Sequence, residues 1–416
     1  MEALYRSCLA GIDVHKKMLA VVVRRETADQ VEYVKRQFGT TRSEIEHLAA
    51  WLQHEGVTEA VMESTAQYWR PVWYGLEPHF RLHLTHPLKT KAPRGRKRDY
   101  RDAQRLADRW RSGDLEASFI PDAEQRSWRS LTRARVHLKK KIGVLHCQVE
   151  GLLEEAGIKL AAVVSDLFGV SSWAMLELIV KGETDPERLL REARGDLRKK
   201  RDALQQALAG RLQPTHRLLL RQAMDQVRLL VAQVEEINAE LAAAMKDCAA
   251  ALVRLTQVPG INLYAAQELI SEIGPRAAAF PSPQQFASWA GVCPGQQQSA
   301  GVCYSSRSAK GNRYLRRLLC QIAWGAIHTK NSFFSDLFAR FKPRLEAKGA
   351  NWAVAHRMAK LIWLILHEDA AYEEKGPAPL NPRTLVRKVR RLVSQFDTQG
   401  MDIRACLNDI LSPAHA

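Results

Sequence analysis

The hydrophobic pattern of the first 86 residues switches repeatedly between the periods of strands and helices. LAGIDVHKKMLAVVVRRE predicts two strands that form a hairpin around His15, and VEYVKRQFG, EAVMES and RLHLTH predict three more. SEIEHLAAWLQHEG predicts a helix with Ile45, Leu48 and Leu52 on one face and Gly56 at its end, and YWRPVWYGLE predicts a second helix. This alternation is typical of an α/β layer fold.

After Pro93 the pattern becomes almost continuously helical, and one segment repeats with a heptad period. The spacing of four and three residues predicts a coiled coil, in which Asn238 takes an a position and fixes the register at some cost in stability. A plain amphipathic helix packed in a bundle accounts for the pattern equally well. The seam consists of Leu220, Met224, Val227, Val231, Val234, Asn238, Leu241 and Met245.

A further helical pattern begins at Leu255. LTQVPGINLYAAQELISEIG resembles a helix-hairpin-helix, whose turn amides at Gly260 can hold a DNA phosphate, although a plain αα-hairpin without a ligand fits as well. A loop, GVCPGQQQSAGVCYSSRSAKGNR, then leads into the basic helix RYLRRLLCQIAWGAIHTK, and PRTLVRKVRRLVSQ predicts a late basic helix. We therefore expect an α/β part (1–150), a helical coiled-coil part (151–250), a mainly helical part (251–345) and a basic helical extension (346–416).

Charge adds a statement about partners. The 416 residues carry a formal net charge of +17, which favours polyanions such as nucleic acid. The longest apolar runs are far shorter than the roughly 20 residues of a membrane span, and the N-terminus lacks the apolar stretch of a secretory signal. The seven cysteines are scattered without a C-x-x-C pair, as expected for reduced thiols. We expect a cytoplasmic, nucleoid-associated protein with no membrane partner.

Four acidic residues point to chemistry. Asp99 and Asp102 lie three residues apart near the start of a helix, so both side chains project from one face. Asp13 and Glu63 lie at the ends of the first and fourth predicted strands, where α/β folds gather their functional groups. If those strands are neighbours, the four carboxylates converge. An all-oxygen set of this kind suits Mg²⁺ (or Mn²⁺), and two such ions can activate an attacking oxygen and stabilise a leaving one in phosphodiester chemistry.

The approach to Asp99 is crowded with cations, which we expect to hold nucleic-acid phosphates. Each acid alone has a plainer explanation: Asp99 as a helix N-cap, Asp102 as a salt-bridge partner and Asp13 as a turn residue. Their joint order along the chain favours the metal site. His15 lies in a predicted turn and receives no role. The cations are Lys89, Lys91, Arg94, Arg96, Lys97, Arg98 and Arg101.

The acidic segments GIDVHK, VMESTAQYW and KRDYRDAQRLA resemble the three motifs of the DEDD transposases of insertion sequences, relatives of the Piv and MooV DNA invertases that are described as bridge-RNA-guided recombinases. The resemblance continues through VPGINLYAAQELISEIG to SAKGNRYLRRLL and so spans most of the chain. It implies an RNase H-like (RuvC-like) N-terminal domain in which Asp13, Glu63, Asp99 and Asp102 hold Mg²⁺.

The resemblance also implies a C-terminal domain with a nucleophilic serine in a Gln-Ser-Gly element. The best match is Ser299, but Ala300 replaces the usual glycine, so Ser305, Ser306 and Ser308 stay open. A serine hydroxyl needs a base or a metal to become a nucleophile. Its attack on DNA would give a covalent serine-DNA intermediate that exchanges with a second DNA without ATP, in agreement with a sequence that has no Walker-type loop.

The implied partners are double-stranded DNA of the element ends and target, a guide RNA, and further copies of the chain in a homodimer or homotetramer. Two other functions use the same residues: a junction-resolving nuclease with water as the nucleophile, and a nucleic-acid-binding protein whose acids are only caps and salt bridges. Cations around the basic helix are expected to hold the nucleic-acid backbone near the serine. They are Arg307, Lys310, Arg313, Arg316 and Arg317.

Overall fold

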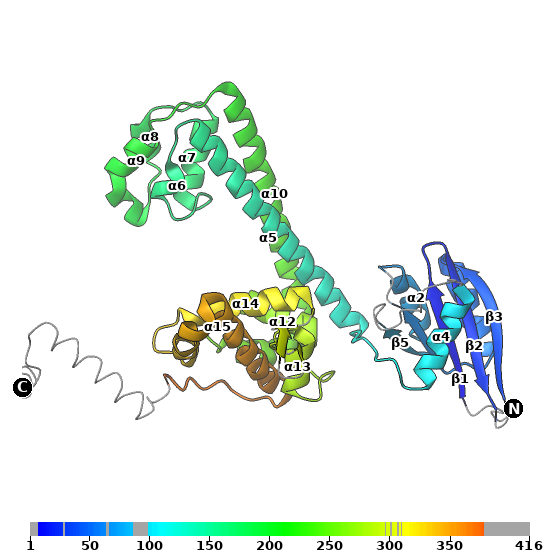
Figure 1. The fold of residues 1–416 in the computed structure, drawn as a ribbon. Helices are drawn as coiled ribbons and strands as arrows, with labels where there is room; N and C mark the ends of the chain where they lie inside the picture. The colour runs from blue at the N-terminus through cyan, green and yellow to red at the C-terminus, as the bar shows by residue number, and fades with distance from the viewer. Residues whose placement is uncertain are drawn as a thin grey trace, which may run out of the picture. The chain divides into compact units, whose positions relative to one another are not determined.

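The computed structural model describes residues 7–27, 30–63, 66–85, 99–295, 297–299, 302–305, 308 and 310–377 (Figure 1). The chain divides into two compact units, an N-terminal unit that ends at Pro121 and a C-terminal unit that begins at Asp122. None of the helices in these described ranges is both long enough and apolar enough to cross a membrane.

The N-terminal unit is built on a five-stranded mixed sheet with the order β3-β2-β1-β4-β5. β1 pairs antiparallel with β2 across the predicted hairpin and parallel with β4, so the predicted first and fourth strands are neighbours. All five strands lie where the hydrophobic pattern predicts them. They are β1 (Ser7–Val14), β2 (Met18–Glu26), β3 (Val31–Gly39), β4 (Glu59–Glu63) and β5 (Arg81–Thr85).

Helices cover both faces of this sheet. α1 (Arg42–His54) and α2 (Trp69–Leu76) bury their apolar faces in a core with alternate residues of β1 and β2, including Ile12 and Val21. α4 (Asp99–Arg111), the predicted D-x-x-D helix, contacts β1, β2 and β4. Since side chains alternate along a strand, residues 11 and 13 of β1 point away from the main core and toward α4.

α4 lies very close to the sheet because residue 11 is glycine. A Cβ atom placed on Gly11 would lie 2.0 Å from the carbonyl oxygen of Ala103 and 3.0 Å from the amide nitrogen of Ala107. Both alanines are completely buried. Helix backbone therefore rests directly on strand backbone. The first turn of α4 lies beside the end of β1, where the predicted acids are.

The C-terminal unit contains a long helical hairpin. α5 (Ala123–Glu155) and α10 (Pro214–Ala244) pack against each other in antiparallel directions (Figure 1). Six of the eight seam residues of α10 are buried, whereas Val231 is exposed and Asn238 is half-buried. The predicted heptad seam thus faces α5 of the same chain, and a coiled coil in the strict sense stays a prediction.

A buried polar layer joins this hairpin to the rest of the unit. The Arg135 side chain of α5 is completely buried and donates to Asn238 Oδ1 of α10 at 3.1 Å. The same guanidinium donates to Gln267 Oε1 at 2.7 Å and to the backbone oxygen of Tyr264 at 3.0 Å, both in α12 (Leu263–Ile273). Burial lowers the pKa of Arg135. The polar seam position predicted at 238 therefore sets how two helices of one chain align.

Between α5 and α10 the chain forms a small helical subdomain, whose Leu160, Met175 and Leu204 share an apolar core with the adjoining ends of α5 and α10. We refer to residues 156–213 as the tip subdomain. Its helices are α6 (Leu160–Val163), α7 (Val170–Val180), α8 (Pro186–Leu190), the 3₁₀ helix η1 (Gly195–Lys200) and α9 (Arg201–Ala207).

After α10 the unit continues with short helices, a two-stranded hairpin and two longer helices. α14 and α15 pack on each other, and α13 packs on α15. α15 is kinked at Glu346, which has a φ of 57°. The elements are η2 (Lys246–Cys248), α11 (Ala249–Thr256), α12, α13 (Pro283–Ala290), β6 (Gln297–Ser299), β7 (Val302–Ser305), α14 (Arg313–Ile327) and α15 (Phe333–His367).

The structure divides the chain at other points than the sequence pattern does. The expected boundary at residue 150 falls inside α5, and those at 250 and 345 fall inside α11 and α15. The division after Pro121 lies in the connection between two helices, α4 and α5, so no change from a strand pattern to a helix pattern marks it. The predicted helix PRTLVRKVRRLVSQ lies outside the described residues.

We expect the substitution Gly11→Ala to destabilise the N-terminal unit by about 2–3 kcal/mol, because the added methyl group can be accommodated only if α4 moves off the sheet. Gly143→Ala is the control, because Gly143 lies in α5 with open space around it and should gain roughly 0.5–1 kcal/mol. Urea unfolding and hydrogen exchange of the α4 amides measure both effects. Full protection of α4 in Gly11→Ala would contradict the close approach.

Candidate active site

Asp13 occupies the end of β1 on the face covered by α4. It follows Gly11 by two residues, so its side chain points to the same side as the glycine. The Asp13 side chain is 13% exposed. A carboxylate so placed is accessible at the edge of the sheet and shielded from bulk water along most of its length.

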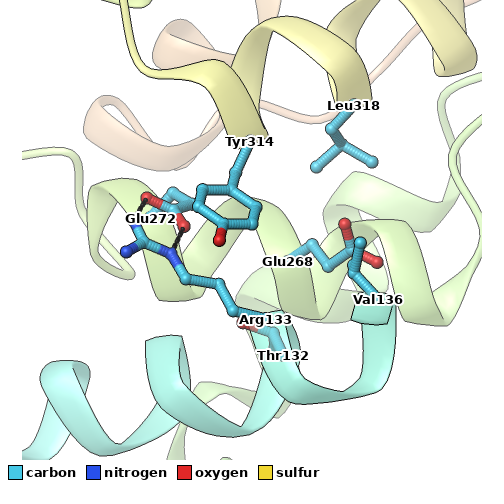
Figure 2. A pocket seen from close by; sticks show the side chains of 7 residues that line it. All are labelled: Thr132, Arg133, Val136, Glu268, Glu272, Tyr314 and Leu318. Atoms are coloured by element: carbon cyan, nitrogen blue, oxygen red, sulfur yellow. Dashed lines mark hydrogen bonds and ion pairs between the residues drawn. The ribbon is translucent and has the colours of Figure 1, made fainter. Parts of the chain in front are cut away.

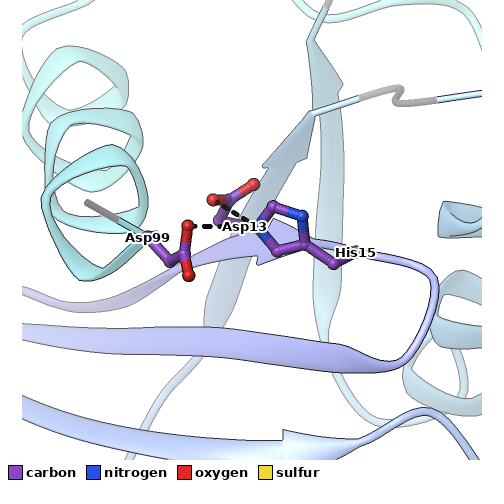
Figure 3. A group of neighbouring side chains, drawn as sticks. All are labelled: Asp13, His15 and Asp99. Atoms are coloured by element: carbon purple, nitrogen blue, oxygen red, sulfur yellow. Dashed lines mark hydrogen bonds and ion pairs between the residues drawn. The ribbon is translucent and has the colours of Figure 1, made fainter. Parts of the chain in front are cut away.

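The first turn of α4 brings two more acids to this position. Asp99 lies four residues before Ala103, and Asp102 lies four residues before Leu106. Ala103 and Leu106 are both buried and pack on the sheet, so the aspartates lie on the same side of the helix. Oxygen atoms of Asp13 and Asp99 and a ring nitrogen of His15 all lie within 4.8 Å of one another (Figure 3). Asp102 lies near enough for its charge to act on Asp13.

His15 belongs to this group, although no role was predicted for it from the sequence. Its Nε2 atom lies 3.1 Å from Asp13 Oδ2 and 3.4 Å from Asp99 Oδ1 (Figure 3). The hairpin turn after β1 folds the histidine back over the strand end, where it bridges the two carboxylates. The sequence does place His15 two residues after Asp13 in GIDVHK. Because His15 lies in a predicted turn, this proximity to Asp13 was not used to predict a role.

Glu63 lies beside this group without belonging to it. Ile12 pairs with Met62 in the parallel ladder, so Asp13 and Glu63 are the next residues on neighbouring strands, roughly 5 Å apart in backbone position. Both therefore face α4. Among the described residues, the set of potential ligand atoms within 4.8 Å of one another contains Asp13, His15 and Asp99 but not Glu63.

The electrostatics of the cluster favour a bound cation. Burial raises the pKa of Asp13, the charges of Asp102 and Asp99 raise it further, and His15 acts in the opposite direction. Asp102 also accepts a hydrogen bond from Arg105 at 3.0 Å. Three carboxylates so close repel one another, and their oxygen atoms are the ligands that Mg²⁺ and Mn²⁺ prefer. The residues present fit a divalent metal ion.

The cations predicted to flank Asp99 fall mostly outside the described residues. Lys89, Lys91, Arg94, Arg96, Lys97 and Arg98 are in that part of the chain, and Arg101 is described and exposed. The phosphate-binding role of all seven stays a prediction.

The serine segment forms a short hairpin where the sequence predicts a loop. β6 contains Ser299 and β7 contains Ser305, and the two strands pair antiparallel with Ser299 opposite Val302. Ser306 and Arg307 lie outside the described residues. Ser308 is described, and its Oγ atom accepts a hydrogen bond from the indole of Trp352 at 2.9 Å. The choice among these serines stays open on the geometry.

The base of this segment is held at two successive residues. A Cβ atom on Gly311 would lie 2.4 Å from the carbonyl oxygen of Ala290, so the end of the segment packs directly on its beginning. Asn312 caps α14 by accepting from the amides of Tyr314 and Leu315, and its Nδ2 donates to Glu272 Oε2 at 2.6 Å. The motif GNR therefore closes the segment at its base.

Glu272 is the centre of a buried ionic cluster. Its side chain is only 3% exposed and accepts two hydrogen bonds from Arg133, at 2.8 and 2.9 Å, as Figure 2 shows. Arg129 lies 3.3 Å from the same carboxylate, and burial lowers the pKa of Arg129 to about 10 despite that neighbour. α5, α12 and the start of α14 meet at this one carboxylate.

The cations of the basic helix are in different environments. Lys310 and Arg313 are exposed. Arg316 lies over the ring of Trp352, 5.0 Å from its centre, and Arg317 pairs with the largely buried Glu268. Glu268 and Tyr314 line the adjoining pocket in Figure 2. Of the described residues in this set, Lys310 and Arg313 are the best placed to contact a nucleic acid.

Gly260, predicted at the turn of a helix-hairpin-helix, has a packing reason to be glycine. Its φ is 84°, and a Cβ atom there would lie 2.2 Å from the carbonyl oxygen of Ile322 in α14. The α11–α12 turn thus sits on α14 close to Gly325. Its predicted contact with a DNA phosphate stays a prediction.

Comparisons with known proteins decide the family. A family model of DEDD transposases of the IS110 type matches residues 10–158, and a second, the transposase IS116/IS110/IS902 family, matches residues 252–338. Together they match more than half of the chain. The chain belongs to the IS110 family of DEDD transposases. Asp13, Glu63, Asp99 and Asp102 lie in the first matched segment of this transposase, and Ser299 lies in the second.

Individual relatives agree with the family. The transposase is 26% identical over 337 residues to "Putative transposase y4qE" of Sinorhizobium fredii. These matched residues cover 77% of the chain and 72% of that protein. It is 24% identical over 282 residues to "Transposase for insertion sequence element IS1111A" of Coxiella burnetii, which covers 66% of the chain and 68% of that protein. The chain is therefore a DNA transposase, an enzyme, and the divalent metal site suits its class.

We expect Asp13→Asn to abolish Mn²⁺ binding, measured by calorimetry, because the substitution removes a charged oxygen ligand from the centre of the cluster. Asp114→Asn, at an exposed acid in the same unit, is the matched control. Unchanged Mn²⁺ affinity in Asp13→Asn would contradict the assignment.

The same substitution should raise stability in the absence of metal. The pKa of Asp13 is higher in the folded chain than in the unfolded chain, so stability is lost as the pH rises through the interval above 3.8. Asp13→Asn removes this loss. In EDTA at pH 7 its melting temperature should exceed that of the unaltered transposase, and the difference should vanish at a pH below 3.8. Equal melting temperatures at pH 7 would count against carboxylate repulsion.

At the base of the serine segment, we expect Asn312→Asp to cost about 2–4 kcal/mol, because it places a second carboxylate against the buried Glu272. Asn312→Ser keeps a helix cap without a charge, so its cost should be only about 1 kcal/mol. Urea unfolding of the full chain compares the two variants. Equal costs would show that Asn312 acts only as a cap.

Proposed function

We propose that this transposase cleaves and exchanges strands of insertion-sequence DNA with Mg²⁺, through a covalent serine-DNA intermediate at Ser299. One observation carries the proposal: oxygen atoms of Asp13 and Asp99 meet at a strand end with Asp102 beside them and Glu63 on the next strand. Phosphodiester chemistry uses divalent metal ions held by carboxylates.

The acids have separate tasks in this proposal. Asp13 and Asp99 supply the central ligands, and Asp102 and Glu63 complete the set as the resemblance to the DEDD family implies. Bound Mg²⁺ supplies Lewis acidity at a phosphate oxygen. His15 holds Asp13 and Asp99 in their orientation by bridging them. The buried alanines of α4 hold this helix against β1, so Asp99 stays beside Asp13 at the end of the strand.

In the cleavage step the Ser299 oxygen forms a bond to phosphorus, its proton passes to a base, and a deoxyribose oxygen leaves as a hydroxyl. A hydroxyl of the second DNA then attacks the phosphoserine ester and releases the serine. Each step exchanges one phosphate ester for another, so no ATP is consumed. The choice of Ser299 rests on the resemblance of Gln298-Ser299-Ala300 to the Gln-Ser-Gly element of the family.

A guide RNA, double-stranded DNA at the element ends and target, and a homodimer or homotetramer complete the proposed working form. The net charge of +17 supports a polyanionic partner. Sequencing the RNA that co-purifies with the transposase tests the guide, since the RNA should be complementary to both the element ends and the insertion site. Recovery of no specific RNA would contradict it.

A second function is metal-dependent hydrolysis of branched DNA, with water as the nucleophile. The acid cluster favours it as well, because Asp13, Asp99 and their neighbours lie in one compact unit that contains every residue such hydrolysis requires. The two functions differ in their need for the serine.

We expect Ser299→Ala to abolish both strand exchange and the covalent protein-DNA adduct, with at least a thousandfold loss of rate. Ser308→Ala is the matched control, because Ser308 accepts a hydrogen bond from Trp352 and its replacement should leave the adduct intact. Gel electrophoresis under denaturing conditions detects the adduct. Undiminished cleavage by Ser299→Ala would favour the hydrolase, and loss of the adduct only in Ser308→Ala would move the nucleophile to residue 308.

A further inference from the structure

Nearly all of the tip subdomain lies between the segments 10–158 and 252–338 that the family models match. Its helices are folded around an apolar core that they share with the adjoining ends of α5 and α10. Nothing in the chemistry of the acid cluster or of the serine hairpin requires it. Its surface therefore needs an explanation of its own.

Charge within the tip subdomain is strongly divided along the chain. Residues 160–185, which contain α6 and α7, have one lysine or arginine and four acids. Residues 186–211, which contain α8, η1 and α9, have eight lysines or arginines and four acids. The two halves thus have opposite net charges of −3 and +4. A surface selected only for solubility mixes the two signs, so this segregation indicates a polyanionic partner for the second half.

Five of the eight cations are exposed and have no ion pair with any carboxylate in the described residues. The other three pair with acids: Arg188 with Glu183, Lys199 with Asp196, and Arg201 with Glu187. The five unpaired cations, which we name the tip basic edge, are Arg191, Arg194, Arg198, Lys200 and Arg211.

Four of these cations lie within one stretch of ten residues, from Arg191 to Lys200. Arg198 donates to the carbonyl oxygen of Ala193, and Lys200 donates to that of Val163. The amide of Arg194 donates to Ser171 Oγ at the start of α7. These contacts fix the 3₁₀ helix η1 against α6 and α7 and leave its cationic groups at the surface.

We propose that the tip basic edge binds the phosphate backbone of duplex DNA. Residues 186–211 contain no aromatic side chain, so this surface has no group on which unpaired bases could stack, and stacking is the usual means of holding single strands and RNA loops. Guanidinium and ammonium groups are sufficient to bind the regular phosphate backbone of a duplex, without aromatic side chains.

The hairpin arm gives this contact a distinct place on the DNA. α10 has 31 residues, so it spans about 46 Å, and the tip subdomain lies at its N-terminal end. That length corresponds to roughly 14 base pairs at a rise of 3.4 Å. α14 contacts α5 at His137, level with Asn238 of α10, so the part of the arm beyond α14 spans about 36 Å. The tip basic edge would therefore contact a duplex segment about one helical turn from DNA held around α14.

The test compares two triple variants of the full chain that remove the same charge. One is Arg191→Gln, Arg194→Gln and Arg198→Gln, and the control is Lys159→Gln, Lys181→Gln and Lys246→Gln, at exposed lysines outside the edge. Affinity for a 60-base-pair duplex is measured in EDTA over a range of salt concentrations, so that cleavage plays no part. Melting temperatures of both variants verify that each is folded.

We expect the edge variant to lose about 2–3 from the slope of log affinity against log salt, and to bind the duplex at least tenfold more weakly at 0.15 M salt. The control should match the unaltered transposase. Equal slopes for the two triple variants would overturn the proposal. A loss seen with a 60-base-pair RNA duplex but not with DNA would overturn the choice of DNA. Because the assay involves no strand cleavage, failure of the serine mechanism would not change its result.

Discussion

The contact of backbone with backbone between β1 and α4 is the constraint on which the candidate site depends. Gly11 has no side chain, and Ala103 and Ala107 carry only methyl groups, so strand and helix backbones approach closely at this point. A helix held at that distance has little freedom to slide or tilt, because close-packed interiors resist displacement. The carboxylates of Asp13 and Asp99, which come from distant parts of the chain, therefore keep a fixed separation despite their mutual repulsion. Repulsion between these carboxylates lowers the stability of the metal-free fold, and the site requires this loss.

The C-terminal unit depends on the opposite kind of interaction. The buried carboxylate of Glu272 gathers Arg129, Arg133 and Asn312 and so joins three helices through charge. Breaking such a cluster by removing one partner leaves an uncompensated buried charge, which is far more costly than the net gain from forming it. This asymmetry gives the start of α14 one position only, and the serine hairpin begins from that position.

Much of the N-terminal unit could be predicted, because each strand and helix there has a clear period bounded by turn residues. The neighbouring positions of β1 and β4 were only a condition in the sequence analysis, which the parallel pairing of the two strands meets. His15 and Glu272 were not predictable: a turn histidine and a glutamate in an apolar helix acquire meaning only from partners far away in sequence. The same holds for Gly260 and Gly311, since sequence shows that a glycine is present but not which backbone lies against it. The division after Pro121 was not predicted because it lies between two helices, α4 and α5, where the hydrophobic pattern does not change from strand to helix.

The fully buried Arg135 lies about one third of the way along α5, so the buried polar layer anchors the helical hairpin near one end. From Arg135 to the end of α5 are 20 residues, or about 30 Å of helix. A tilt of roughly 10° about this layer would carry the far end by about 5 Å, while atoms at the layer itself hardly move. Arg129, Arg133 and Arg135 all bond to α12 at this layer, so a small rearrangement among them would become a large displacement of the tip subdomain.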